Sequence, residues 1–177
     1  MSVIETLFSE DEIAHRVRAL AEEIAASHPH RLLVVPLLKG SFIFAADLVR
    51  ALHRTGLTPH VDFLTLSSYG AGLESSGHVR VLRDVESDIE GRDVLVVDDI
   101  LESGRTLKVA CELLRSRGAA RVATCVLLDK RGRRRTAIEA DHVGFDAPDV
   151  FVVGYGMDAG HAHRELPFVG IVREPGS

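Results

Sequence analysis

The stretch Val94-Leu-Val-Val-Asp-Asp-Ile-Leu-Glu-Ser-Gly-Arg-Thr106 decides the fold of this chain. Its first four residues are apolar and three of them are β-branched, which is typical of a strand buried on both faces of a parallel sheet. Asp98 and Asp99 end the apolar run, and a polar loop then leads into a helical pattern that starts at Thr106. Because ligands of such sheets bind beyond the carboxyl ends of the strands, the sequence predicts a ligand site here.

The loop after the two acids has the residues of a phosphate-binding site. Its backbone N–H groups, the hydroxyls of Ser103 and Thr106 and the helix N-terminus can together surround a phosphate. Gly104 permits the backbone to approach the ligand closely. Two carboxylates beside a phosphate need a cation between them and the ligand, and Mg²⁺ takes both kinds of oxygen. The alternative is a plain strand–loop–helix unit with a solvated acidic turn.

The composition narrows the class of protein. At 177 residues the chain fits one domain with a substantial core, and 46% hydrophobic and 27% charged residues are an ordinary globular mixture. A net charge of −5 gives no support for nucleic-acid binding. No membrane span or signal peptide is recognisable, so we expect a cytoplasmic protein without a membrane partner. Cys111 and Cys125 follow a helical and a strand pattern, and we expect both to be reduced core residues.

Helical and strand patterns alternate along most of the chain. A capping box at 9–12 starts a helix that we expect to run to about Ser27, and a second helix is expected at 42–53, before Gly56. The other expected elements are strands at 32–35, within 60–69, at 79–82 and at 122–128, a helix from Thr106 to Gly118, and short strands at 143–145, 151–153 and 169–172. This alternation predicts an α/β fold with a mainly parallel central sheet flanked by helices.

The glycine- and serine-rich stretch 70–77 begins Gly-Ala-Gly, as a dinucleotide-binding loop can. Ser75 occupies the position of the third glycine and no apolar-periodic helix follows, so we reject the dinucleotide reading. Glycine and serine favour a mobile loop instead, although an ordinary long hairpin tip is the alternative.

Several motifs in this order resemble the hypoxanthine (hypoxanthine-guanine) branch of the type I phosphoribosyltransferases. They are residues 94–106, Leu37-Leu38-Lys39-Gly40-Ser41, Ser67-Ser68-Tyr69-Gly70, and 143–149 followed by 152–155. The resemblance covers roughly residues 5 to 172. It implies that the 5-phosphoribosyl group passes from 5-phosphoribosyl 1-diphosphate (PRPP) to hypoxanthine or guanine, giving IMP or GMP and pyrophosphate.

The resemblance also implies an architecture and an assembly. The fold would be a single domain over residues 1–177, with a core at about 30–135 and a small hood from about 1–12 and 140–177. Family members are usually homodimers or homotetramers, and we expect a homo-oligomer on this ground alone.

The resemblance assigns a role to each motif residue. Ser103, Gly104, Arg105 and Thr106 match the 5′-phosphate loop, and Lys39, Gly40 and Arg164 match the pyrophosphate contacts, with a peptide before Lys39 that can be cis. Ser68 and Tyr69 match the base of a flexible loop that closes over PRPP. Lys130, Phe151, Val152 and Asp158 match the purine-binding residues. Asp98 and Asp99 match the ligands of the ribose hydroxyls and of Mg²⁺, and Asp158 matches a ligand of a second Mg²⁺.

Three positions depart from the family pattern. Glu102 stands where the family has the aspartate that serves as general base, and its arm is longer by one methylene. Asp98 stands in place of the usual glutamate. Ala159 stands where an aromatic usually follows the acid at 158, which loosens the wall near the purine 2-position. These departures leave two alternatives open: an enzyme that prefers xanthine or another 6-oxopurine, and a catalytically weak nucleotide-sensing regulator.

Two further features have plain interpretations. The basic run 131–135 is interpreted as a solvated turn, with a contribution of one arginine to pyrophosphate binding or to a subunit interface as the alternative. His161 and His163 are two residues apart, which is a weak metal-site pattern and is more typical of surface residues.

Overall fold

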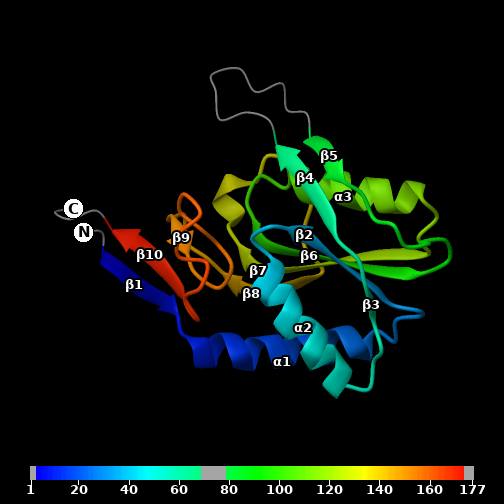
Figure 1. Ribbon diagram of the computed structural model, residues 1–177, viewed down its shortest axis with the longest axis horizontal. Helices are drawn as coiled ribbons and strands as arrows, with labels where there is room; N and C mark the ends of the chain where they lie inside the picture. The colour runs from blue at the N-terminus through cyan, green and yellow to red at the C-terminus, as the bar shows by residue number, and fades with distance from the viewer. Residues whose placement is uncertain (1–2, 69–78, 174–177) are drawn as a thin grey trace.

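The computed structural model describes residues 3–68 and 79–173, and a seven-stranded sheet lies at its centre (Figure 1). Its strands are β2 (Leu33–Leu38), β3 (His60–Val61), β4 (Leu64–Ser68), β5 (Val79–Arg83), β6 (Asp93–Leu101), β7 (Arg121–Asp129) and β8 (His142–Asp146). The order is β5-β4-β2-β6-β7-β8, and β3 pairs with β2 off this path. Only the β4–β5 pair among them is antiparallel, so the predicted mainly parallel sheet is confirmed.

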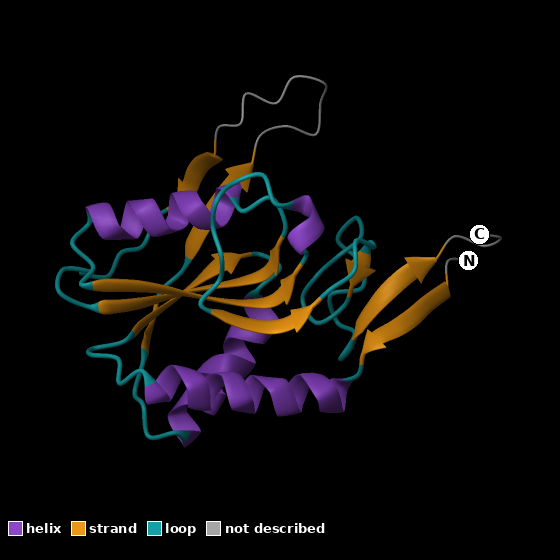
Figure 2. Cartoon of the chain, turned by 180° about the vertical axis from the view of Figure 1, so that it is seen from behind, coloured by secondary structure: helices purple, strands orange, loops and turns teal. Residues whose placement is uncertain are grey.

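Helices cover both faces of the sheet, as Figure 2 shows from behind. Helices α1 (Glu10–Ala26) and α2 (Phe42–Arg54) lie on one face, and α3 (Arg105–Ser116) lies on the other. Leu95 and Val97 of β6 pack into the core beneath α1 and α2, whereas Val94 and Val96 pack into the core beneath α3. Complete burial of one such side chain contributes about 1.5–3 kcal/mol, so this strand anchors both halves of the core.

The first helix begins where the sequence predicts. Ser9 caps α1: its hydroxyl accepts from the N–H of Glu12 at 3.3 Å, and its own N–H donates to the Glu12 carboxylate at 2.8 Å. This reciprocal pair satisfies two N–H groups that a helix start leaves free.

The central strand β6 is longer than predicted. Ile100 and Leu101 continue the pairing with Leu128 and Asp129 of β7, so Asp98 and Asp99 lie inside the strand rather than beyond its end. On the other side, pairing with β2 stops at Val97. The sheet therefore opens on one side of the two acids while the other side stays paired. The predicted strand within 60–69 is likewise two strands, β3 and β4.

A second, three-stranded antiparallel sheet is formed by the two ends of the chain. It contains β1 (Val3–Phe8), β9 (Val152–Val153) and β10 (Val169–Arg173) in the order β1-β10-β9. We use the name hood for these strands and the loop 154–168. The hood lies beside the central sheet, next to the carboxyl ends of its parallel strands (Figure 1).

The prediction that the hood begins near residue 140 is wrong for the strand predicted at 143–145. That segment is β8, which pairs in parallel with β7 and belongs to the central sheet. A short 3-10 turn at Arg131–Arg133, rather than a helix, precedes it. The usual alternation of strand and helix is therefore interrupted in the sequence although the parallel sheet continues.

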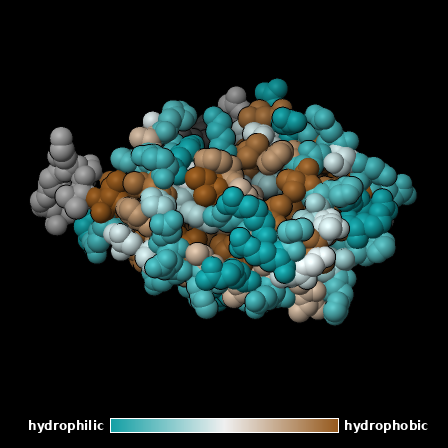
Figure 3. Space-filling view, turned by 60° about the horizontal axis from the view of Figure 1, so that its bottom comes forward, coloured by the Kyte–Doolittle hydropathy of each residue, from teal (hydrophilic) through white to brown (hydrophobic). Residues whose placement is uncertain are grey.

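The described surface carries both hydrophilic residues and a few large exposed apolar side chains. On the face presented in Figure 3, apolar residues in brown lie between hydrophilic ones. The described residues with large exposed apolar side chains are Phe42, Val61, Phe63, Val81, Leu82 and Phe151. Within the described ranges, no helix has the length and hydrophobicity needed to cross a membrane.

Candidate active site

Two adjoining hollows lie at the carboxyl ends of the central strands. The larger, about 460 Å³, is lined by residues of the β2–α2 loop, the ends of β6 and β7, and the hood. The smaller, about 350 Å³, is lined by residues 98–104 and 106–107, which run from β6 to the start of α3. Asp99, Ile100 and Glu102 line both hollows. A ligand with two parts, joined near these three residues, would fit this arrangement.

The smaller hollow is formed by the loop that the sequence predicts to bind phosphate. Asp98, Asp99, Ser103, Gly104 and Thr106 all line it. The φ angle of Gly104 is +83°, and a Cβ there would lie 2.5 Å from a methyl carbon of Ile138, so only glycine fits. The side chain of Arg105 is exposed and lines neither hollow. Any contribution of Arg105 to the loop in this arrangement is therefore a contribution of its backbone.

Asp98 and Asp99 form a half-buried pair of acids. The Asp99 N–H donates to the Asp98 carboxylate at 2.9 Å, and the Ile100 N–H donates to the Asp99 carboxylate at 2.8 Å. Burial raises the pKa of both carboxyls, and the neighbouring Asp99 raises the pKa of Asp98 further. The nearby Arg164 acts in the opposite direction on Asp99. A bound cation would favour the charged form of both acids.

The β2–α2 loop brings Lys39 and Gly40 against the acid pair. A Cβ at Gly40 would lie 1.8 Å from the Asp99 carboxylate, which explains why glycine is needed. The peptide between Leu38 and Lys39 is cis, in agreement with the resemblance. Lys39 is exposed and lines the larger hollow, so its ammonium is available to an anionic ligand.

Glu102 and Lys130 meet in the larger hollow. The Lys130 ammonium donates to the Glu102 carboxylate at 2.8 Å, and the lysine side chain is only 5% exposed. Parallel pairing of Leu101 with Asp129 places the residues that follow them side by side. The Lys130 N–H also donates to the Leu101 carbonyl at 2.9 Å, which fixes this alignment. A hydrogen-bond acceptor, the Glu102 carboxylate, and a cationic donor, the Lys130 ammonium, therefore lie side by side in the lining of the larger hollow.

Phe151 and the hood strand that follows it supply another part of the lining. Phe151 leaves 58% of its surface exposed and lines the larger hollow together with the buried Val152 and Met157. Such an exposed aromatic beside a cleft is suited to stacking on a flat ligand. The predicted purine-binding residues Lys130, Phe151, Val152 and Asp158 are thus brought together.

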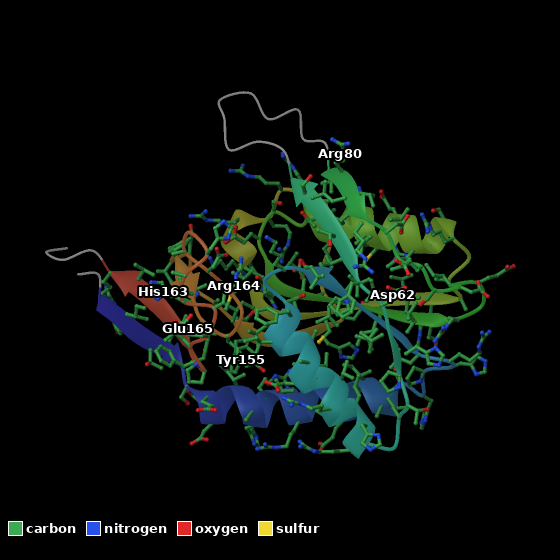
Figure 4. All side chains as sticks on the ribbon, in the orientation of Figure 1. Asp62, Arg80, Tyr155, His163, Arg164 and Glu165 are labelled. Carbon is green, nitrogen blue, oxygen red and sulfur yellow. The ribbon has the colours of Figure 1, made fainter. Side chains whose placement is uncertain are left out.

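The hood loop is held by Asp158 and Arg164. One Asp158 oxygen pairs with Arg164 at 2.8 Å and the other accepts from the His161 N–H at 2.7 Å. Arg164 also donates to the Gly156 carbonyl at 2.6 Å. Figure 4 shows Arg164 on the hood with His163 and Glu165. Both carboxylate oxygens of Asp158 therefore have protein partners in this arrangement.

The hood also packs directly on the β2–α2 loop and on α2. A Cβ at Gly156 would lie 2.4 Å from the Gly40 carbonyl oxygen, so the two loops touch through their backbones. The Tyr155 hydroxyl donates to Asp47 of α2 at 2.6 Å. In Figure 4, Tyr155 lies between the hood and the two helices α1 and α2. These contacts fix the position of the hood relative to the β2–α2 loop and to α2.

A metal site made by protein groups alone is absent from the described ranges. There, His, Cys, Asp and Glu side chains form no group of three or more that could hold a metal ion. Asp98 and Asp99 supply two carboxylates, and a metal would need further oxygens from a ligand. The assignment of Asp98, Asp99 and Asp158 to Mg²⁺ stays a prediction. The paired histidines 161 and 163 gain no support as a metal site.

The interpretation of the basic run as a solvated turn is wrong for one residue. Arg134 is 15% exposed, pairs with the buried Asp129, and donates to the carbonyls of Leu101 and Glu102 at 3.2 and 2.7 Å. Sequence reasoning missed it because five neighbouring basic or glycine residues gave no pattern that distinguishes one arginine. The predicted loop residue Tyr69 lies outside the described residues, and Ser68 ends β4.

Comparisons with known proteins agree with the motifs. The family model described as the phosphoribosyl transferase domain matches residues 4–159. A hypoxanthine-guanine phosphoribosyltransferase of Aquifex aeolicus is 46% identical over 173 residues, covering 97% of this chain and 96% of the relative. The Dictyostelium discoideum protein of the same name is 41% identical over 172 residues, covering 96% of each. A solved hypoxanthine phosphoribosyltransferase from Staphylococcus aureus has a TM-score of 0.89 at 40% identity, covering 96% of this chain and 91% of that one.

Proposed function

This chain belongs to the phosphoribosyltransferase family, in the branch of the hypoxanthine-guanine phosphoribosyltransferases, and we propose how its two hollows divide the reaction. The larger hollow takes the 6-oxopurine and the pyrophosphate, and the smaller takes the 5′-phosphate of PRPP. The products are IMP or GMP and pyrophosphate, as in purine salvage.

The contact between Glu102 and Lys130 carries this assignment. A 6-oxopurine presents a ring nitrogen and a 6-oxygen side by side on one edge. A carboxylate 2.8 Å from an ammonium can serve both, because the carboxylate accepts the nitrogen-bound proton and the ammonium donates to the oxygen. Adenine carries a 6-amino group, whose N–H donors would face the donor Lys130, so adenine is rejected.

The chemical step is a displacement at C1 of the ribose. A bond forms from the purine nitrogen N9 to C1 as the bond from C1 to the pyrophosphate oxygen breaks, and the proton on N7, the ring nitrogen beside the 6-oxygen, passes to Glu102. General-base assistance of this kind contributes about 10²–10⁴-fold. Lys39 and Arg164, which line the same hollow, stabilise the leaving pyrophosphate by charge. Positioning of the two substrates supplies much of the remaining acceleration.

Mg²⁺ fits the acid pair. Asp98 and Asp99 are adjacent, half-buried and raised in pKa, so a divalent cation would relieve their mutual repulsion. Mg²⁺ is commonly bound by one or two carboxylates with the remaining oxygens from substrate phosphates and water. When bound, the ion would neutralise the developing charge of the pyrophosphate. The pairing of Asp158 with Arg164 must loosen if Asp158 is to take part.

The remaining assignments are also proposals. Ser68 and Tyr69 form the base of a loop that closes over PRPP, and the chain is a single domain. We expect a homodimer or homotetramer, for which the exposed Phe42, three residues after Lys39, offers apolar contact surface. The cytoplasmic location stays a prediction from the sequence.

A preference for xanthine or another 6-oxopurine is the second candidate. The turn after Asp158 is closed by a β-bridge between Ala159 and Ala162, and of the residues 159–162 only His161 lines the larger hollow. With Ala159 in place of an aromatic residue, less side chain would close off the edge of the base near Asp158. A substituent at the purine 2-position would meet this edge.

The test is nucleotide formation by the purified protein with PRPP and Mg²⁺. Hypoxanthine, guanine, xanthine and adenine are supplied separately. We expect turnover with hypoxanthine or guanine and none with adenine. Preferred turnover of xanthine would favour the second candidate. PRPP binding without turnover of any of the four bases would contradict both and favour a nucleotide-sensing regulator.

A further inference from the structure

We propose that Arg134 is a positioning residue that aims the backbone N–H groups of the phosphate loop at the 5′-phosphate. This inference rests on the proposed function, since it gives the smaller hollow a phosphate ligand. Arg134 does not line either hollow. It would act through the peptides of Glu102 and Ser103, which do line the smaller one.

The first observation is the set of contacts that Arg134 makes. One guanidinium nitrogen donates to the carbonyls of Leu101 and Glu102, and the other pairs with Asp129. Asp129 is 1% exposed, so its charge needs cationic partners; Arg134 is the nearer one at 2.5 Å, and Arg131 lies at 3.4 Å from its other oxygen. The guanidinium therefore joins the end of β6 to the end of β7, at the point where the ladder between these strands stops.

The two residues after Arg134 also donate hydrogen bonds to the phosphate loop. The N–H groups of Arg135 and Thr136 donate to the Ser103 carbonyl at 2.9 and 3.1 Å. The carbonyls of two successive residues, Glu102 and Ser103, are thus turned toward the segment 134–136. We call this set of donors the loop brace: the Arg134 guanidinium and the two N–H groups.

Because the peptide bond is planar, holding these two carbonyls also sets the direction of the N–H groups that face the smaller hollow. In a planar trans peptide the C=O and the following N–H point in opposite directions. Holding the Glu102 and Ser103 carbonyls on one side therefore holds the N–H groups of Ser103 and Gly104 on the other. Within the described part of the chain, neither N–H donates to a protein acceptor. Successive free N–H groups of this kind form an anion-binding concavity.

The neighbouring arginines show that this role belongs to one position of the run. Arg131 and Arg133 leave 67% and 55% of their side chains exposed, and Arg133 pairs with the exposed Asp149. Neither donates to the phosphate loop. Arg133 therefore provides a matched control with the same charge on the same turn.

The experiment compares two ligands that differ only in the 5′-phosphate. IMP carries the phosphate and inosine does not, so the ratio of their dissociation constants isolates the phosphate contact. Arg134→Lys keeps the positive charge beside Asp129, but an ammonium cannot span both carbonyls and the carboxylate as the guanidinium fork does. We expect IMP to bind about tenfold more weakly, with inosine unchanged, since correctly aimed charge-assisted hydrogen bonds are lost. The Michaelis constant for PRPP should rise while that for hypoxanthine stays the same.

Two further variants keep the result interpretable. Arg133→Lys should leave both dissociation constants unchanged. Should Arg134→Lys fold poorly, the double variant Arg134→Gln with Asp129→Asn removes both charges together, and the same ratio is measured there. The proposal is overturned if IMP binding is unchanged in a folded variant, or if inosine weakens as much as IMP. Failure of the unaltered protein to bind IMP would instead overturn the proposed function.

Discussion

The two hollows of this site are built in different ways. The smaller is made by one continuous stretch, 98–107, through small side chains and backbone groups. The larger is made by long side chains from four separate parts of the chain, among them Lys39, Glu102, Lys130 and Arg164. A phosphate needs only N–H groups in the right directions, whereas a purine edge needs particular donors and acceptors. The departures from the family pattern touch both hollows, since Asp98 lines the smaller one, Glu102 lines both, and Ala159 follows Asp158 of the larger one.

The largest effect on catalysis is expected in the larger hollow, from Glu102→Gln. The amide keeps an oxygen that can accept from Lys130, but it cannot take a proton from the purine. We expect kcat for hypoxanthine to fall by about 10²–10⁴-fold, with little change in the Michaelis constant for PRPP. Steady-state kinetics measure both. The exposed Glu165, changed to Gln, serves as the control. A variant that keeps its kcat would show that Glu102 is not the base.

The next effect is expected from Lys130→Met, which removes the donor to the 6-oxygen and keeps the bulk of the buried arm. Loss of one charge-assisted hydrogen bond should lower kcat/KM for hypoxanthine by about 10–100-fold. Discrimination against adenine should weaken, because the clash between donors disappears. Lys108→Met on the exposed face of α3 is the matched control. Unchanged discrimination would mean that another group reads the 6-position.

A smaller effect is expected on the phosphate side, from Gly104→Ala. The added methyl meets Ile138 at 2.5 Å and the φ of +83° is strained for alanine, so we expect the free energy of unfolding to fall by about 1–3 kcal/mol. The Michaelis constant for PRPP should rise more than that for hypoxanthine. Urea denaturation and kinetics measure the two effects.

Gly132→Ala is the control for this change. Nothing lies within 4 Å of a Cβ at Gly132, and this glycine is not among those with a positive φ. Equal destabilisation by both substitutions would contradict the account of Gly104.

The comparison of the two hollows also separates what the sequence predicts from what it cannot. The buried strand at 94–97, the Ser9 cap and the whole phosphate loop were predictable, because each depends on residues that are close in the chain. The residues matched to the family include most of those that line the larger hollow, but not Ile100, Met157 or His161. Local pattern and family resemblance therefore reached most of the site.

The remaining features depend on register and on crossover geometry. The contact of Glu102 with Lys130 requires the pairing of Leu101 with Asp129, which no local pattern specifies. The burial of Arg134 depends on the same strand ends. The wrong assignment of residues 143–145 to the hood has a related cause. A helical pattern usually precedes a parallel strand in the sequence, and only a short 3-10 turn precedes β8. Tertiary pairing, rather than propensity, decided each of these.

The last prediction concerns the two cysteines, whose reactivity toward a thiol reagent measures how readily the two halves of the core open. Cys111 on α3 lies in the core behind the phosphate loop, and Cys125 on β7 lies in the core beneath α1 and α2. Burial raises the pKa of Cys111 to about 11 and raises the pKa of Cys125 further. Because the thiolate is the reactive form, both thiols should resist iodoacetamide at pH 8.

Raising the pH should separate the two cysteines. The folded-state pKa of each thiol lies above the unfolded value of about 8.5, so the folded state retains the proton more tightly. Stability should therefore fall as pH rises past about 8.5, and labelling of Cys111 should grow about tenfold per pH unit towards its pKa. Mass spectrometry of intact protein should find Cys111 labelled before Cys125. Earlier labelling of Cys125 would show that the core beneath α1 and α2 opens more readily than the core behind the phosphate loop, and would reverse the expected order of rigidity.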